Sequence, residues 1–325
     1  MNWSVAHNLS LRRTAFRDFF NEMVGGRGSS GGGNTYWMLN FTRWLHNGKH
    51  FFQTTDALDQ MLAATDIGRD IPANFIRTPF PEQFIQFGET MSSPLTVWNA
   101  ATQNHRAEGC YVRSGMLPDN MGSIPESLLG HGHRFIEFVF TGSSLGKSHN
   151  LDDATQAVTV AIPDEDATML DVIEATLAAD DAVGRQKHPD EAASIRSTFY
   201  HAAKILLYLN IDGVAKRPLL ERSELQAKLA RIKGGKRGKV ERQLLRSYDR
   251  IVIGPKTAPA PAVGAAPTDG TGRHVVSCHW RRGHFRSQAY GERHSLRRPA
   301  WIAPILVNAE AAITTPTGKP YTLKT

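Results

Sequence analysis

The densest cluster of side chains that could bind or react lies between His274 and Trp301. This segment holds four histidines and six arginines, together with cysteine, tyrosine and tryptophan side chains. Histidine can act as a general acid or base, arginine can bind phosphate or carboxylate, and cysteine with histidine can bind a metal. The segment is therefore the first candidate for a functional site, and three kinds of chemistry compete for it.

The first kind of chemistry is metal binding. Cys278, His279 and His284 are residue types that zinc accepts, but their spacing matches no familiar zinc pattern and no second cysteine lies nearby. Adjacent residues in a strand point to opposite faces, which separates Cys278 from His279. The glycine-rich stretch at 25–33 lacks the lysine-serine or lysine-threonine ending of a phosphate-binding loop. We therefore expect neither a metal nor another cofactor.

Two functional interpretations of the cluster remain open, beside a purely structural one in which it is a solvated, arginine-rich strand pair with Trp280 and Trp301 in a small core. A metal-free ribonuclease could use His284 as acid or base, with Arg286 and Tyr290 beside the phosphate and Arg282 as a further cation. A recognition surface would instead use the arginines to bind phosphates or carboxylates and the aromatic residues as anchors. No ordered acid–base pair can be named, so we expect no intrinsic catalytic activity, with a ribonuclease as the enzymatic alternative.

The charge of the chain is divided unevenly along its length. Residues 1–200 hold 15 Lys/Arg against 23 Asp/Glu, a formal charge of −8, whereas residues 201–325 hold 23 against 8, a formal charge of +15. A basic rear half is typical of proteins that meet nucleic acid or another polyanion. The expected RNA or ribosome face comprises Lys228, Arg231, Lys236, Arg237, Lys239, Arg242 and Arg246.

The pattern of apolar residues predicts the elements that must position these side chains. Periodicity near 3.6 predicts helices, and short runs rich in β-formers predict strands. Helices are expected at residues 3–24, 35–45, 56–64, 163–179, 190–209, 221–232 and 236–247. Strands are expected at 84–87, 95–98, 110–112, 135–140, 157–162, 251–253, 275–276 and 301–307. Together they predict an α+β fold with a mixed or antiparallel sheet.

Composition shifts predict the domain organisation. We expect a mixed helix and sheet body at 1–210, a basic helical segment at 211–254, a Pro/Ala/Gly/Thr-rich flexible linker at 255–272, a small β-rich unit at 273–310 and a tail at 311–325. Two distant cysteines, and the lack of a signal-peptide block or a membrane-length apolar run, predict a cytoplasmic protein.

Two stretches, residues 221–255 and 279–307, resemble a known family. Their features are similar to those of the type V-A anti-CRISPR family that suppresses biogenesis of the type V effector nuclease, and of its phage and plasmid relatives. The Arg-Gly-His-aromatic core of that family is met by Arg282, Gly283, His284 and Phe285, and its later positions by Arg298, Trp301 and Pro304. An upstream stretch, residues 49–52 followed by 57–58, is also similar.

The resemblance implies a protein of mobile genetic elements. It implies recognition of the N-terminal peptide of a nascent target, with a type V effector as the candidate target, and loss of the message being translated. The implied partners are that peptide, the ribosome or RNA, and a host nuclease, without a membrane. No catalytic residue is carried over. The recognition residues expected from the cluster are Arg282, Gly283, His284, Phe285, Arg286, Tyr290, Arg298 and Trp301.

Overall fold

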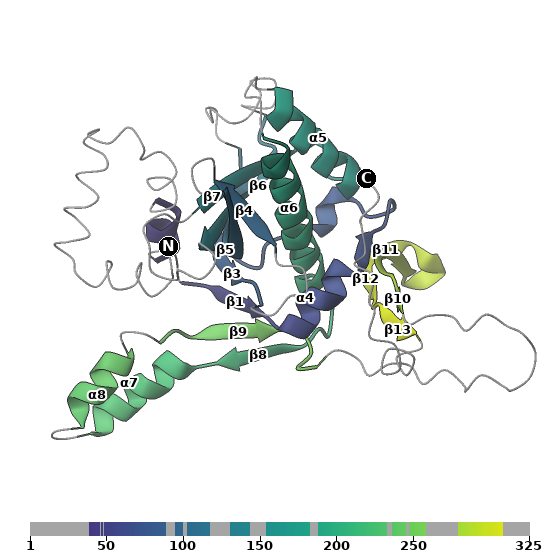
Figure 1. Cartoon of the computed structure of the whole chain (residues 1–325). Coiled ribbons are helices and arrows are strands. Elements are labelled where there is room, and N and C mark those ends of the chain that lie inside the picture. Colours follow the sequence, from purple (N-terminus) through teal and green to yellow (C-terminus); the bar gives the residue numbers. More distant parts are fainter. Residues whose placement is uncertain are drawn as a thin grey trace, which may run out of the picture.

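The computed structural model describes residues 39–45, 47, 49–88, 95–99, 103–117, 131–143, 154–182, 188–232, 236–244, 247–257 and 279–307. These residues form helices and a mixed sheet, which confirms the predicted α+β fold (Figure 1). The predicted helix at 3–24, the glycine-rich stretch, most of the predicted linker, the strand at 275–276 and the tail lie outside the described residues.

The main sheet has eight strands in the order β7-β6-β5-β3-β1-β9-β8, with β4 beside β5. Strand β1 runs parallel to both β3 and β9, whereas the other neighbouring pairs are antiparallel. The strands are β1 (Phe51–Thr54), β3 (Glu82–Gln86), β4 (Thr96–Asn99), β5 (Gln103–Met116), β6 (Arg134–Ser143), β7 (Ala154–Ile162), β8 (Lys216–Leu219) and β9 (Arg250–Ile253). The sequence did not predict β1 or β8, and β5 is much longer than the predicted 110–112.

A bulge in β5 allows two strands to share one of its edges. The pairing of β5 with β6 shifts register between Ala107 and Gly109. On one side of the bulge β5 pairs with β3, and on the other side it pairs with β4. A Cβ at Gly109 would lie 3.0 Å from the Gln86 Cα and against the Ile85 carbonyl oxygen. Only glycine therefore allows this close approach of the strands.

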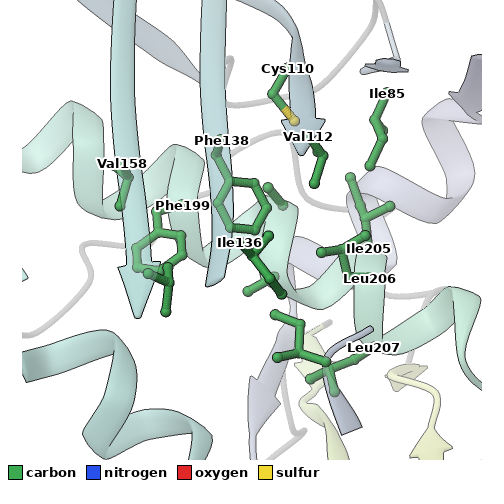
Figure 2. Packing of buried hydrophobic residues seen from close by; sticks show 14 of the residues in the cluster. Ile85, Cys110, Val112, Ile136, Phe138, Val158, Phe199, Ile205, Leu206 and Leu207 are labelled. Carbon is green, nitrogen blue, oxygen red and sulfur yellow. The ribbon is translucent and has the colours of Figure 1, made fainter. Parts of the chain in front are cut away.

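Three helices pack on one face of the sheet: α4 (Asp56–Ala63), α5 (Met169–Ala182) and α6 (Pro189–Leu209). The predicted helix at 190–209 is confirmed, and α6 lies across the middle of the sheet (Figure 1). Its buried side chains, among them Phe199, Ile205 and Leu206, meet Ile136 and Phe138 from β6 (Figure 2). Apolar burial on this face is the main force that holds the body together.

The opposite face of the sheet carries an aromatic cluster centred on Trp44. Residues 39–45 form a helix that places this ring 6.4 Å, centroid to centroid, from Phe51, Phe84 and Tyr111. Trp44 and Phe41 are each 1% exposed, so both aromatic rings belong to the core. The sheet is therefore covered on both faces.

The acidic residues at 164–166 do not form the first turn of a helix, which corrects the predicted start at 163. Helix α5 begins at Met169, and the Thr168 hydroxyl accepts a hydrogen bond from the Asp171 N–H. Glu165 instead forms an ion pair with Arg134 at 2.7 Å. The spacing of apolar residues cannot locate the start of α5, because residues 163–168 form a turn. Contacts with distant residues, such as the ion pair of Glu165 with Arg134, stabilise this turn.

The remaining elements form two small sheets and a helical pair. Strand β11 (Gly283–Tyr290) lies between β12 (Leu296–Ile302) and β2 (Thr65–Ile67), and β10 (His279–Arg281) pairs with β13 (Ile305–Val307). Helices α7 (Glu221–Arg231) and α8 (Arg237–Leu244) follow β8. The predicted basic segment at 211–254 contributes β9 to the main sheet, and the predicted unit at 273–310 contributes Phe285 to the main core. Both segments therefore pack with the body. Their division into domains stays a prediction.

None of the helices in the described ranges is both long enough and apolar enough to cross a membrane.

Candidate functional site

The histidine- and arginine-rich segment folds as a hairpin that is attached to the body through β2. Strand β11 runs parallel to β2, with Phe285 opposite Ile67. Phe285 is completely buried in the same core as α4 and α6. Beyond the end of β2, the Gly68 N–H donates to the Phe285 carbonyl at 3.0 Å and the Ser287 N–H donates to Asp70 Oδ2 at 2.9 Å. The hairpin is thus part of the packed body and not a loop on its surface.

Trp301 of β12 anchors the second strand of the hairpin. Its ring lies 6.1 Å from Phe285 and 5.3 Å from Tyr208 of α6, measured between centroids. The indole Nε1–H donates to Thr65 Oγ1 at 3.2 Å, and the Thr65 hydroxyl donates to the Met61 carbonyl at 2.7 Å. Trp301 therefore connects the hairpin with β2, α4 and α6 through packing and one chain of hydrogen bonds.

Gly283 and Pro304 fit together at the start of β11. A Cβ at Gly283 would lie 2.6 Å from the Ile302 carbonyl oxygen and 2.7 Å from Pro304 Cδ. Backbone atoms cannot move away as a flexible side chain could, so glycine is required here. The glycine, the aromatic residue, the tryptophan and the proline that carry the family resemblance thus all serve the folding of this hairpin.

The opposite face of the hairpin points to solvent, and we call it the outward face. Side chains in a strand alternate between faces, and the register places His284 opposite Ile302, Gln288 opposite Arg298 and Tyr290 opposite Leu296. The outward face therefore consists of His284, Arg286, Gln288, Tyr290, Leu296, Arg298, Ala300 and Ile302.

The outward face combines cations with exposed apolar side chains. Leu296, Ile302 and Tyr290 are 51%, 39% and 38% exposed, and the Arg298 guanidinium lies 5.1 Å from the centre of the Tyr290 ring. Arg286 donates to Gln288 at 2.5 Å. Asp66 of β2 lies opposite His284 in the parallel register, so its carboxylate stands at the β2 edge of this face, where it forms an ion pair with Arg282. Such a surface is suited to an extended segment that carries both apolar and negatively charged groups.

The structure separates the predicted recognition residues into three groups. His284, Arg286, Tyr290 and Arg298 share the outward face, whereas Gly283, Phe285 and Trp301 point into the protein. Arg282 forms an ion pair with Asp66 at 3.1 Å, with both side chains more than half exposed. Leu296 and Ile302 were not among the predicted recognition residues. Once the pairing of β11 with β12 is known, the alternation of side chains along both strands places these two residues on the same face as His284 and Arg286.

The three residues considered for zinc are described only in part. Cys278 lies outside the described residues, His279 lies in β10, and His284 lies on the outward face. Within the described ranges, no three histidine, cysteine, aspartate or glutamate side chains come together in a way that could hold a metal ion.

The basic segment forms a second surface, which we call the arm and define as α7 and α8. The predicted helices are confirmed, with slightly shorter bounds. The arm extends from the ends of β8 and β9 away from the body, on the side opposite to the β11–β12 hairpin (Figure 1). Helix α7 buries none of its residues, and α8 buries only Val240. The described predicted cations, Lys228, Arg231, Lys236, Arg237, Lys239 and Arg242, are all exposed, and Arg246 lies outside the described residues.

The base of the arm is held by a set of polar contacts. Asp249 Oδ1 accepts hydrogen bonds from the N–H groups of Arg222 and Ser223 at 3.0 and 3.1 Å, at the start of α7. The Arg222 guanidinium donates to the Leu244 carbonyl at 2.9 Å, and Arg250 pairs with Glu221 at 3.1 Å. These contacts connect both helices with β9, so the arm has a fixed direction.

A buried lysine lies where the hairpin meets the body. Lys204 Nζ of α6 donates to the Leu62 carbonyl at 3.0 Å. Burial lowers the pKa of Lys204 from its ordinary value of 10.5 to about 8; the Arg282 guanidinium also lowers it, whereas the Asp66 carboxylate raises it. Holding this charge in the folded protein therefore costs stability at neutral pH.

Replacing this lysine with methionine is expected to stabilise the protein below pH 8. Between about pH 8 and 10.5 the unfolded chain keeps a proton that folded Lys204 has released, so the stability of the wild type rises with pH. We expect Lys204→Met to add about 1–3 kcal/mol at pH 7 and to lose that advantage toward pH 10.5. Urea unfolding of both proteins across this pH range measures the difference. A gain that does not change with pH would contradict the assignment.

A buried polar network was missed by sequence analysis. Thr55 caps α4, with its hydroxyl accepting from the Leu58 N–H at 3.2 Å. Asp59, however, is fully buried and lies 2.8 Å from His201 Nε2 of α6. Its other oxygen accepts from the Thr54 hydroxyl at 2.5 Å and from the Gly88 N–H at 2.6 Å. The network fixes α4 against α6 and against the ends of β1 and β3.

Comparison with known proteins gave one family match. The family model described as AcrVA2-like, anti-CRISPR type V subtype A2 family, matches residues 52–309. The match includes the hairpin, the arm and nearly all of the main sheet. Among curated proteins, none matches this chain.

Proposed function

Because the chain belongs to the anti-CRISPR type V subtype A2 family, we propose that it recognises the N-terminal peptide of a nascent target protein and causes translation-coupled loss of the corresponding mRNA. A type V CRISPR effector is the candidate target, and the ribosome or RNA and a host nuclease are the candidate partners. The protein would act in the cytoplasm on behalf of a mobile genetic element.

The outward face is the observation that carries the peptide part of this proposal. The inner side chains of the hairpin are committed to folding, whereas the outer side chains leave three large apolar groups and two arginines exposed. Apolar anchors surrounded by charge are what a peptide-binding surface requires. The two exposed arginines of this face, Arg286 and Arg298, favour a peptide that carries aspartate or glutamate beside its apolar residues.

A reporter experiment tests the proposed function in cells. The first codons of the candidate effector are fused to a reporter gene, and reporter mRNA is measured with and without the protein. A frameshifted fusion keeps nearly the same RNA but encodes another peptide, and a fusion without its start codon is not translated. We expect mRNA loss only for the in-frame, translated fusion. Equal loss of all three messages would overturn peptide recognition.

Reversing the two arginines of the outward face is expected to weaken peptide binding. Arg286→Glu combined with Arg298→Glu introduces repulsion against an acidic peptide and removes the cation beside Tyr290. We expect affinity for a labelled N-terminal effector peptide to fall about 10-fold or more, measured by fluorescence anisotropy. The matched control is Arg293→Glu with Arg297→Glu, which changes the charge of the same hairpin equally but off the outward face. Equal weakening by both pairs would mean that net charge alone attracts the peptide.

The ribonuclease alternative uses residues of the same face. His284, Arg286 and Tyr290 share that face and are all exposed, but six positions separate the histidine from the tyrosine along β11. Arg286 is two positions from His284 on the same strand, and the Asp66 carboxylate, which lies opposite His284 in the register of β2, is paired with Arg282. Purified protein incubated with labelled message distinguishes the two functions. Cleavage that disappears in a folded His284→Ala variant would replace peptide recognition with ribonuclease activity.

A further inference from the structure

The arm concentrates positive charge where the folding of the protein does not require it. Lys236 and Arg237 lie at the start of α8, which carries no acidic residue in its first turn. The positive end of a helix dipole disfavours cations at this place. A helix that only needed solubility would carry aspartate or glutamate there. The basic start of α8 therefore costs stability and indicates a binding role.

The spacing of these cations places them in rows. Lys228 and Arg231 are three residues apart near the end of α7, and Lys236, Lys239 and Arg242 follow at the same interval along α8. Residues three apart lie on the same side of a helix. Since the end of α7 is followed by the start of α8, both rows converge toward the tip of the arm.

Most of this charge is not used within the protein. Arg237 pairs with Glu241 at 2.9 Å, but the five cations of the rows have no ion-pair partner among the residues that the structure describes. Glu221, one of the few acids of the arm, is engaged by Arg250 at its base. The tip therefore presents a concentrated, exposed positive charge on a support of fixed direction.

The composition of the arm distinguishes between kinds of polyanion. Neither α7 nor α8 contains an aromatic residue. Proteins that bind single-stranded RNA stack its bases on aromatic side chains, whereas double-helical RNA is held mainly through phosphates and the 2′-hydroxyl groups. Rows of lysine and arginine without aromatic residues fit a phosphate backbone whose bases are already paired.

We propose that the arm is an RNA-binding element that holds the phosphate backbone of double-helical RNA without reading its sequence. This inference goes beyond the proposed function and does not depend on it, because the arm and the β11–β12 hairpin lie on opposite sides of the body (Figure 1). Double-helical segments are the form of RNA that a ribosome or a folded message would present to it.

The test measures binding of the full-length protein to a short blunt RNA duplex, by fluorescence anisotropy at several salt concentrations. The tested variant, which we call the tip variant, carries Lys236→Glu, Arg237→Glu and Lys239→Glu. The matched control carries Arg69→Glu, Lys256→Glu and Arg281→Glu, which changes net charge equally at exposed positions outside the arm. Thermal unfolding of both variants confirms that they remain folded.

We expect the tip variant to bind the duplex about 10- to 100-fold more weakly than the control variant at low salt. The slope of the logarithm of its binding constant against the logarithm of salt concentration should also be shallower, by about one unit for each phosphate contact that is lost. Equal binding by the tip and control variants would overturn the proposal.

Two further outcomes separate this inference from its alternatives. Binding of the single strand as tightly as the duplex would overturn the preference for double-helical RNA. Failure of the wild type to bind either RNA at physiological salt would indicate an acidic protein as the partner of the arm, and would also overturn the proposal. Peptide binding, measured separately, is expected to be unchanged in the tip variant, so that failure here leaves the proposed function intact.

Discussion

Replacing His201 with alanine is expected to destabilise the protein by about 3–5 kcal/mol, because it leaves the Asp59 carboxylate buried without its partner. The two side chains are 3% and 0% exposed, and their closest polar atoms lie 2.8 Å apart. Thr54 and Gly88 still donate to the other carboxylate oxygen, but neither supplies the lost contact. The Phe87 ring, 5.3 Å from the imidazole, loses packing as well.

A double-mutant cycle separates this pair from simple loss of packing. His201→Ala, Asp59→Ala and the double variant are compared by urea unfolding. In the double variant, neither side chain is left buried without its partner. Its loss of unfolding free energy should therefore be clearly smaller than the sum of the losses in the two single variants. Additive losses would show that the pair contributes no specific interaction. The hairpin and the arm contact neither residue, so duplex RNA binding of the folded variants serves as a check on global structure.

The elements that could be predicted from the sequence are those stabilised by local order. Helix α6 shows its period within its own residues, and Ile195, Phe199 and Leu206 are buried as their spacing predicts. Helices α7 and α8 could also be predicted, because their cations and their thin apolar stripe recur at helical spacing within the sequence of each helix. Local periodicity is therefore enough to predict a helix and the side on which it packs.

The elements that could not be predicted depend on residues far away in the chain. Phe52 of β1 pairs with Ile85 on one side and Ile251 on the other, and Thr65 of β2 pairs with Gly283. Strands of three or four residues contain too few side chains to show alternation. Their identity follows from their parallel neighbours, and no local pattern reports those neighbours.

The candidate site shows the same division. The segment between His274 and Trp301 could be found from composition alone, and four of its predicted recognition residues share one exposed face. The inward position of Phe285 and the packing of Trp301 on α6 could not be found, because they follow from pairing with β2 and from contacts with distant residues. Likewise, the partner of Asp59 lies 142 residues away.

Replacing Trp301 with alanine is expected to destabilise the protein by about 3–5 kcal/mol and to loosen the hairpin before the rest of the fold. The indole packs on Tyr208 and Phe285 and donates to Thr65. Its removal leaves a cavity between β12 and α6 and breaks the hydrogen-bond chain to Met61. The proposed peptide-binding surface depends on this anchor, because the inner side chains of the same two strands, together with the pairing of β11 with β2, hold the outward face in place.

Trp301→Phe is the matched variant, since it keeps an aromatic ring but loses the hydrogen bond to Thr65, and we expect it to cost about 1–2 kcal/mol. Hydrogen exchange measures the local effect: the Ser287 amide, which donates to Asp70, should lose protection in Trp301→Ala while amides of α6 keep theirs. Peptide affinity should fall in Trp301→Ala and stay close to that of the wild type in Trp301→Phe. If the Ser287 and α6 amides lose protection equally, the hairpin unfolds only together with the body. The outward face is then as rigid as the core beneath it, and peptide binding should follow global stability alone.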